Sequence, residues 1–394
     1  MIQMINAAFM LVLLIYMDQA GFEDHESASF IKYRFLSILA FAFPLGLFIR
    51  GRKIKPFFFL AAALAPLSAL AVIFAIDLHI VWLIYASQIL WGIAFISIQV
   101  TALPYILRNV PPKDQTEAIS LSYSTFSLSA IISGIIIFGL KTLLPDIFDL
   151  KLVLQIIACF GFLALPVVYQ LKGTENTNKA LAQERNKKYL LFDFDWGLIF
   201  KAMFPTVIIA VGAGLTIPFI SLFFYKIHGM EAELFSILGA LAMGLVFFSV
   251  LFVPKIKSIL GYRRAIPLTQ GLAILALVSL GATEWYKYHY LAIIIAIGCY
   301  LIRQPLMNLA GPMTSELTMN YVGKKNQEIV SALTSSVWSG SWFISSLLFE
   351  IMRQYKIDYV HIFMMTAGLY SIGVVLYILL IQDYERRMEA NLID

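Results

Sequence analysis

Apolar residues run through this chain in long stretches that short polar segments separate. A helix needs about 20 mostly apolar residues to cross the hydrocarbon core of a bilayer. Twelve stretches meet that requirement, and they span roughly residues 2–20, 30–49, 56–76, 80–107, 118–140, 152–171, 197–225, 234–254, 265–283, 290–313, 328–350 and 360–382. The pattern therefore predicts an all-α integral membrane protein with twelve transmembrane helices.

The polar pattern also repeats once along the chain, at an offset of 211 residues. Residues 117–134 read EAISLSYSTFSLSAIISG, and residues 328–345 read EIVSALTSSVWSGSWFIS. Each segment opens with Glu, reaches its first Ser after two apolar residues and then carries small hydroxyl residues along an apolar helix. The offset also aligns the basic pair Arg52 and Lys53 with Arg263 and Arg264. We therefore expect two pseudo-symmetric six-helix bundles.

Lysine and arginine gather on one side of the predicted spans. Membrane proteins carry an excess of these residues in their cytoplasmic loops. With both termini inside, cytoplasmic segments hold 19 of the 29 basic residues and outer segments hold eight, Arg34 among them. We therefore expect cytoplasmic N- and C-termini, with a polar cytoplasmic linker at residues 172–196 between bundles at residues 1–171 and 197–394.

Composition argues for the same class of protein. Hydrophobic residues make up 60% of the chain, charged residues only 13%, and the mean hydropathy is +0.82, whereas soluble domains carry about 25% charged residues. The first apolar stretch has no basic n-region and no small-residue cleavage site, so we expect a retained span. Cys159 and Cys299 both lie in apolar stretches, which argues against a disulfide framework or a thiolate metal site.

Twelve spans, two six-span halves, a central cytoplasmic loop and basic turns resemble the major facilitator superfamily over essentially the whole chain. That resemblance implies a secondary transporter working by alternating access. The turn of the family between spans two and three usually reads Gly, an acidic residue, then Arg-x-Gly-Arg-Lys. Here Gly46 is followed by Leu-Phe-Ile and then Arg-Gly-Arg-Lys at residues 50–53, without the acid. The gating role of that acid is therefore not carried over.

Two further motifs depart from the family pattern. Proton-coupled branches usually place Arg four residues before Gly in span four, where this chain has Gln88 before Gly92. The Gly-Pro motif of drug antiporters in span five is missing, because Gly134 is followed by Ile135. The segments GAGLTIPFISLFF in span seven and IRQPLMNLAGPM in span ten resemble a poorly characterised bacterial subgroup. The expected location is the bacterial cytoplasmic (inner) membrane.

Arg303 is the strongest candidate for a functional side chain. It lies about ten residues from either end of the tenth expected span, near the bilayer midplane. A charge there costs about 3 kcal/mol on insertion scales, so it normally faces a cavity or a partner. At helical periodicity Tyr300, Gln304 and Asn308 share its face, while Ile302, Leu306 and Leu309 lie opposite and can meet lipid. The alternative is a structural arginine bound to carbonyls or to a carboxylate of another helix.

We expect the substrate to contact residues of spans four, five, seven, ten and eleven. Hydroxyl-rich helix faces either line water or pack helices closely, and both alternatives apply to spans five and eleven. The predicted substrate-binding residues are Arg303, Gln304, Asn308, Tyr300, Gln99, Trp91, Tyr123, Ser127, Thr334, Trp338 and Trp342.

Gating is expected from the basic turns and from a break in span seven. Residues 212–218 read GAGLTIP, which unwinds part of the helix towards a ligand or simply kinks it. The predicted gating residues are Arg52, Lys53, Arg263, Arg264, Gly214 and Pro218.

These features predict a non-enzymatic transporter of a small organic solute, either neutral or anionic, with a proton or sodium as the candidate coupling ion. We expect a monomer in contact with membrane lipids, with no cofactor, no metal and no nucleic acid, because no Walker loop, nucleophile elbow, CxxC or paired-histidine motif occurs. Two alternatives remain open. One is a lipid flippase on the same scaffold, and the other is a non-transporting membrane receptor or assembly factor.

Overall fold

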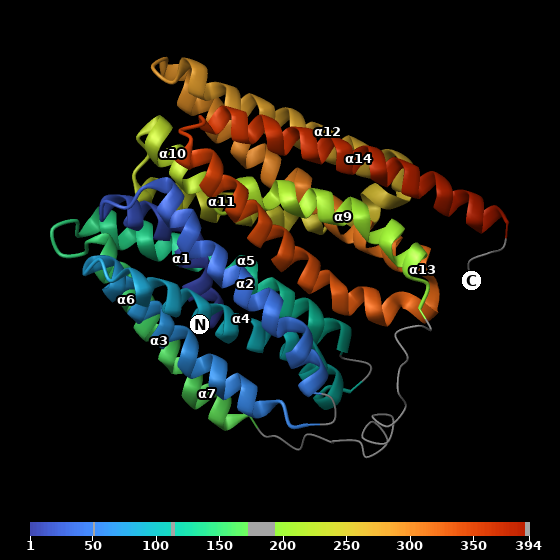
Figure 1. Ribbon diagram of the computed structural model, residues 1–394, viewed down its shortest axis with the longest axis horizontal. Coiled ribbons are helices and arrows are strands. Elements are labelled where there is room, and N and C mark those ends of the chain that lie inside the picture. The colour runs from blue at the N-terminus through green and yellow to red at the C-terminus, as the bar shows by residue number, and fades with distance from the viewer. Residues whose placement is uncertain (50–51, 112–114, 172–193, 391–394) are drawn as a thin grey trace. The chain divides into compact units, whose positions relative to one another are not determined.

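The computed structural model describes residues 1–49, 52–111, 115–171 and 194–390, and every regular element in these ranges is helical (Figure 1). The helices of the first part of the chain are α1 Ile2–Gln19, α2 Asp24–Phe48, α3 Lys55–Asp77, α4 Val81–Asn109, α5 Gln115–Leu143, α6 Leu150–Phe160, η2 Gly161–Leu163 and α7 Ala164–Gln170. Those of the second part are α9 Trp196–Thr216, α10 Ile220–His228, α11 Ala232–Val250, α12 Val253–Ala282, η4 Thr283–Tyr286, α13 Tyr290–Gln354 and α14 Tyr359–Glu389.

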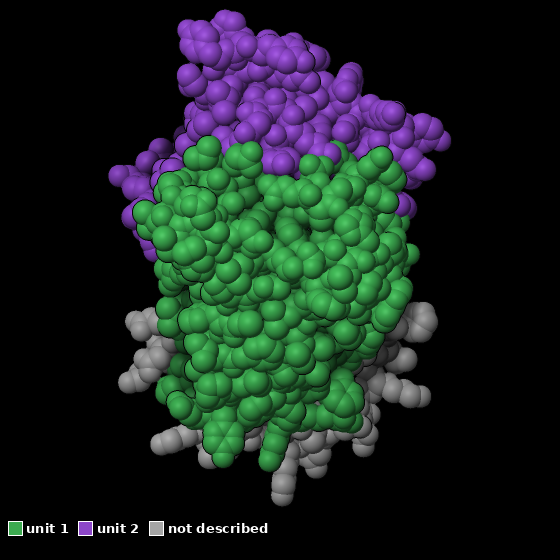
Figure 2. Space-filling view, turned by 90° about the vertical axis from the view of Figure 1, so that its left-hand side faces the viewer, with its two compact units in different colours: residues 1–190, 231–240 green, residues 191–230, 241–394 purple. Residues whose placement is uncertain are grey.

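The chain divides into two compact units, coloured separately in Figure 2. Unit 1 holds residues 1–190 and 231–240, and unit 2 holds residues 191–230 and 241–394. The first part of α11 thus groups with unit 1. The expected boundaries at residues 171 and 197 stay a prediction, since the linker at residues 172–196 lies mostly outside the described residues.

Eleven helical segments in the described part are long and apolar enough to cross a membrane. They correspond to eleven of the twelve expected spans. The remaining one, residues 328–350, is helical as the later part of α13 but is not among the eleven, and serines interrupt it at positions 331, 335, 336, 339, 341, 345 and 346. The protein is therefore a multi-pass helical membrane protein, and the count of twelve and the cytoplasmic termini stay predictions.

Local sequence fixes where several helices begin. At the start of α2 the side chain of Glu23 accepts from the third helical backbone N–H, and the Glu23 backbone N–H donates to Glu26 Oε2 over 2.9 Å. This reciprocal capping satisfies two N–H groups that otherwise lack partners. It begins α2 at Asp24, six residues before the expected span at residue 30. Arg34 consequently lies well inside the helix.

Two glycines interrupt helices of unit 2 with non-helical backbone. Gly261 within α12 has φ +62° and Gly323 within α13 has φ +70°. Residues with a Cβ rarely adopt this region. Gly323 therefore divides α13 into an arm that carries Arg303 and an arm that carries Trp342.

Packing within each unit follows from which helices pair. In unit 1, α4 packs against α2 and α3, while α1 packs against α5 and α6. In unit 2, α9 packs against α13 and α14, and α12 runs beside α13 and α14 (Figure 1). The helices α4 and α9 therefore bring buried polar residues next to two neighbouring helices each.

Candidate functional site: two buried arginine clusters

Arg303 is buried inside unit 2, as its position in the sequence predicted. Its side chain is 1% exposed, and Nη2 donates to the hydroxyl of Tyr370 on α14 over 3.2 Å. The guanidinium carbon lies 5.9 Å from the centroid of the Tyr370 ring. Among the described residues no carboxylate lies within 4.0 Å of the arginine, and its Nε has no hydrogen-bond partner. The positive charge is thus held by an aromatic hydroxyl and a ring rather than by an acid.

A glycine of α9 makes room for the partner of Arg303. A Cβ added at Gly212 would lie 3.0 Å from the ring of Tyr370, so the absence of a side chain there lets the ring pack against α9. Tyr300 and Gln304, one turn or less from Arg303 on α13, are 3% and 7% exposed. Three residues of the expected polar face of α13 are therefore buried, and we name Arg303, Tyr370, Tyr300 and Gln304 the Arg303 cluster.

The opposite face of this arm meets lipid only in part. Ile302 is 57% exposed, as expected, but Leu309 is only 8% exposed. The expectation that Leu309 faces lipid is wrong, because Leu309 lies on a packed part of the surface of α13.

Unit 1 contains a second buried arginine, Arg34, which we had counted among the basic residues of the outer segments. Its side chain is 4% exposed within α2, so Arg34 is buried in the helix rather than exposed in an outer loop, and the side of the membrane stays a prediction. Nε of Arg34 donates to Oε1 of Gln88 on α4 over 2.9 Å, and its guanidinium carbon lies 4.7 Å from the centroid of the Trp91 ring. Trp91 in turn packs on Phe9 of α1 at 4.3 Å between ring centroids. We name Arg34, Gln88, Trp91 and Phe9 the Arg34 cluster.

Gly92 explains how α2 comes this close to α4. A Cβ at Gly92 would lie 1.8 Å from Ser37 Oγ and 2.6 Å from the backbone oxygen of Arg34. In the repeat offset of 211 residues, Gly92 is the position equivalent to Arg303. The glycine therefore replaces the arginine of the other half and admits the helix that carries Arg34. Span four lacks the family's arginine at Gln88, yet a guanidinium reaches Gln88 from α2.

The remaining predicted residues fall into different environments of the two units. In unit 1, Trp91 is buried, Gln99 is exposed and Ser127 is half-buried, while the side chain of Tyr123 lies outside the described part. In unit 2, Asn308 is exposed and its amide donates to the carbonyl of Gln304, Thr334 is half-buried and donates to the carbonyl of Val330, Trp338 is 37% exposed and Trp342 is half-buried. Their role in binding substrate stays a prediction.

The serines at the closest helix contacts pack helices against each other. Ser345 is fully buried and donates to the carbonyl of Val211 over 2.6 Å, and a Cβ at Gly214 would lie 2.7 Å from it. In unit 1, Ser133 donates to the carbonyl of Met4 over 3.0 Å. At these positions small residues let backbones approach closely, as small residues do between membrane helices.

The break in span seven is present and is filled by side chains. Helix α9 ends at Thr216 and α10 begins at Ile220. Thr216 donates to Thr366 Oγ1 over 2.9 Å, and Phe219 stacks on Phe349 with ring centroids 3.6 Å apart. Pro218 within the break is buried. In the described conformation this geometry agrees with a packed kink, while the gating roles of Gly214 and Pro218 stay predictions.

The basic turns expected to act in gating lie at exposed helix ends. Arg52, Lys53 and Arg264 are exposed, and the guanidinium of Arg52 lies 3.8 Å from the centroid of the Phe48 ring. Arg263 Nη1 lies 3.8 Å from Glu385 Oε2. Exposed pairs of this kind contribute about 0–1 kcal/mol, which is compatible with contacts that open and close.

An additional charged cluster joins three helices of unit 2. Oδ2 of Asp383 on α14 lies 2.8 Å from Lys201 Nζ on α9 and 3.1 Å from Arg387 Nε, and it also accepts from the hydroxyl of Tyr321 on α13. Sequence reasoning missed this cluster because Lys201 and Tyr321 lie 182 and 62 residues from Asp383, on other helices. The only signal was an interfacial lysine, Lys201, at the start of span seven, with no partner on its own helix.

Comparison with known proteins identifies the class of this architecture. Its fold is similar to that of the POT family transporter PepTSo (TM-score 0.76, 12% identity, covering 98% of this chain and 96% of that one). A bacterial homologue of the iron transporter ferroportin is comparably similar (TM-score 0.75, 12% identity, 96% and 95%), as is the xylose transporter XylE from E. coli (0.72, 10%, 95% and 92%). These likenesses concern the fold alone.

Sequence comparison gives the family directly. No curated protein matches the chain significantly. A family model described as Major Facilitator Superfamily matches residues 1–346, which covers unit 1 and most of unit 2. The chain therefore belongs to the major facilitator superfamily.

Proposed function

We propose that this protein is a secondary transporter that moves a small organic solute with an anionic group by alternating access, and that Arg303 binds that group. The observation that carries the proposal is the environment of Arg303. Its guanidinium is buried, donates to one hydroxyl and has no acid beside it within the described part. A buried charge in a membrane protein normally has a partner, and an anionic solute supplies the missing one.

The residues around Arg303 support an organic solute rather than a bare inorganic ion. The ring of Tyr370 lies beside the guanidinium, and Tyr300 and Gln304 are buried within one turn of Arg303 on α13. Ligand sites typically combine apolar and aromatic walls with few polar groups that fix orientation. Gln304 would orient the solute, and Tyr370 would position the guanidinium.

Energy for transport would come from a gradient, with a proton or a sodium ion as the coupling ion. One neighbour of similar fold is a D-xylose–proton symporter, and this coupling belongs to that protein. We place the protein in the bacterial cytoplasmic membrane as a monomer, in line with the expectations from its sequence.

The test begins with purified protein in detergent and panels of monocarboxylates, organic phosphates, sugars and nucleosides. Unfolding temperatures are measured for the wild type, Arg303→Gln, Arg303→Lys and the matched control Arg264→Gln, which alters an exposed arginine. An anionic solute should stabilise the wild type and the control, stabilise the lysine variant less, and leave the glutamine variant unchanged. About tenfold weaker binding corresponds to 1.4 kcal/mol.

Proteoliposome flux of the identified solute then tests transport itself. The Arg303→Gln variant should lose uptake, and a pH or sodium gradient should alter the rate of the wild type. The proposal fails if only neutral or cationic solutes stabilise the protein and Arg303→Gln binds them unchanged.

A further inference from the structure

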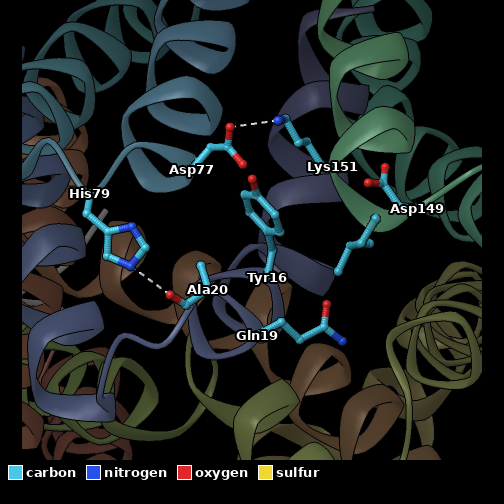
Figure 3. Close-up of a pocket in the computed structure, with 8 residues that line it drawn as sticks. Tyr16, Gln19, Ala20, Asp77, His79, Asp149 and Lys151 are labelled. Carbon is cyan, nitrogen blue, oxygen red and sulfur yellow. Dashed lines mark hydrogen bonds and ion pairs between the residues drawn. The ribbon is translucent and has the colours of Figure 1, made fainter.

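A cavity of about 320 Å³ lies in unit 1 where α1 and α3 end and α6 begins (Figure 3). Helix α1 contributes Tyr16 and Gln19, α3 contributes Asp77, and the beginning of α6 contributes Asp149 and Lys151. Its volume is at the lower end of the range of about 300–1,000 Å³ for small-molecule sites. It belongs wholly to unit 1 and contains neither buried arginine.

The hydroxyl of Tyr16 points into this cavity without a partner. The side chain is 7% exposed, and its hydroxyl makes no hydrogen bond within the described part. Figure 3 shows the hydroxyl directed between Asp77 and Lys151. Buried hydroxyls nearly always have a hydrogen-bond partner, so a ligand group at this place would complete the site.

The walls of the cavity carry more negative than positive charge. Asp77 Oδ2 lies 2.7 Å from Lys151 Nζ, and both side chains are partly exposed. Oδ1 of Asp149 caps α6 by accepting from the Leu152 N–H over 2.7 Å. Two carboxylates thus face one ammonium. The segment that follows α1 adds Glu23, Asp24 and Glu26 to the same end of the helices.

The rim of the cavity is held in a fixed, strained conformation. His79 has φ +55°, uncommon for a residue with a Cβ. Its Nε2 lies 2.9 Å from the carbonyl oxygen of Ala20, and its ring stacks on Phe22 with centroids 5.0 Å apart. Backbone strain of this kind gathers at ligand clamps and switch regions. The contact fixes the end of α1 relative to the end of α3, and so fixes the spacing of Tyr16 and Asp77.

We propose that this cavity binds a small organic ammonium compound. The N–H groups of the ligand donate to the free oxygens of Asp77 and Asp149 and to the Tyr16 hydroxyl oxygen, and Gln19 contacts its polar remainder. A partly exposed ion pair is weak, so the ligand competes with Lys151 for Asp77 at little cost. An ammonium with N–H donors balances the excess negative charge of the cavity and also gives the Tyr16 hydroxyl a hydrogen-bond partner.

Titration calorimetry of the purified full-length protein with ethanolamine and putrescine tests the site. Propionate, sorbitol and calcium chloride serve as anionic, neutral and metal comparisons. Both amines should bind and the three comparisons should not, and affinity should fall as salt increases because part of the attraction is coulombic and screened. Preferred binding of propionate, sorbitol or calcium, or no binding of either amine, overturns the proposal.

Four variants determine the sign of the charge that the ligand carries. Asp77→Asn should weaken amine binding about tenfold, whereas Lys151→Met should strengthen it severalfold because it removes the competing cation. Tyr16→Phe, which deletes one oxygen, should weaken binding about three- to tenfold. Asp146→Asn is the matched control, since Asp146 is an exposed acid near α6 outside the cavity lining.

Weaker binding in Lys151→Met, or an equal loss in Asp146→Asn and Asp77→Asn, contradicts the site. None of these measurements follows flux or involves Arg303. Their failure therefore leaves the proposed transport function intact, and failure of that function leaves this site intact.

Discussion

The Arg34 cluster and the Arg303 cluster both bury a guanidinium, but they hold it in different ways. Arg34 donates to an amide and lies over an indole, with α2 drawn against α4 at Gly92. Arg303 donates to a phenol, and the glycine beside it, Gly212, accommodates the partner ring rather than the arginine helix. The two halves thus each bury one guanidinium, but the arginine comes from helices that are not equivalent in the repeat.

The repeat offset makes this exchange visible position by position. Arg303 aligns with Gly92, and Arg34 aligns with Leu245, which is 45% exposed on α11. In the repeat alignment, the position equivalent to each arginine therefore carries a leucine or a glycine in the other half. Each cluster leaves buried polar atoms without a partner in the described part, Nη2 of Arg34 and Nε2 of Gln88 in one and Nε of Arg303 in the other. The clusters therefore differ in what holds the guanidinium, an amide with an indole against a phenol.

The largest expected effect comes from closing the space at Gly92. Gly92→Ala should destabilise the protein by about 3 kcal/mol, because the added Cβ would meet the backbone oxygen of Arg34 as well as Ser37. Unfolding temperature in detergent measures the change. Gly271→Ala in α12 is the control, since nothing lies within 4 Å of its Cβ. Equal stability of the two variants would show that α2 does not depend on the glycine.

An intermediate effect is expected from separating Arg34 and Gln88. Arg34→Met should cost about 1–3 kcal/mol, because it leaves the buried amide of Gln88 without its donor. Adding Gln88→Leu should recover more than half of that loss, because both polar partners are then gone. A double-mutant cycle measured by thermal unfolding gives the coupling. If the stability losses of Arg34→Met and Gln88→Leu are additive, Arg34 acts through contacts other than Gln88. If Arg34→Met loses solute binding, Arg34 is itself a ligand-binding residue.

The smallest effect is expected at the partner of Arg303. Tyr370→Phe removes one hydroxyl and should reduce stability by about 1 kcal/mol. The ring remains, so the variant should still be stabilised by the anionic solute, with several-fold weaker binding because the guanidinium is less well positioned. The readout is the solute-dependent shift in unfolding temperature. If the variant binds the solute more tightly, the hydroxyl competes with the ligand instead of positioning the arginine.

The sequence predicted the burial of Arg303 but not the burial of Arg34, for a definite physical reason. Arg303 lies in the middle of an apolar stretch, so span length and helical periodicity were enough to bury it. Arg34 follows Lys32 near the start of a stretch that appeared to begin at residue 30. Only the reciprocal capping by Glu23 and Glu26 shows that α2 begins earlier. The spacing Glu-x-x-Glu before an apolar stretch was the available signal.

The sequence alone could not predict which residues of distant helices are the partners of Arg303 and Lys201. Tyr370 is 67 residues from Arg303, and Asp383 is 182 residues from Lys201. Periodicity places residues on a helix face, but it does not say which helix lies opposite. The hydroxyl-rich faces left packing and cavity lining as alternatives for the same reason, and Ser345 was assigned to packing only by its contact with α9.

The glycine that divides α13 has a genetic consequence. Every single-base missense change in a glycine codon introduces a residue with a Cβ. At φ +70° and ψ +164°, a region that essentially only glycine adopts, that residue is strained by about 1–3 kcal/mol. Nothing lies within 4 Å of a Cβ at Gly323, so the penalty is confined to the backbone. Alleles at this position should therefore be temperature-sensitive rather than null.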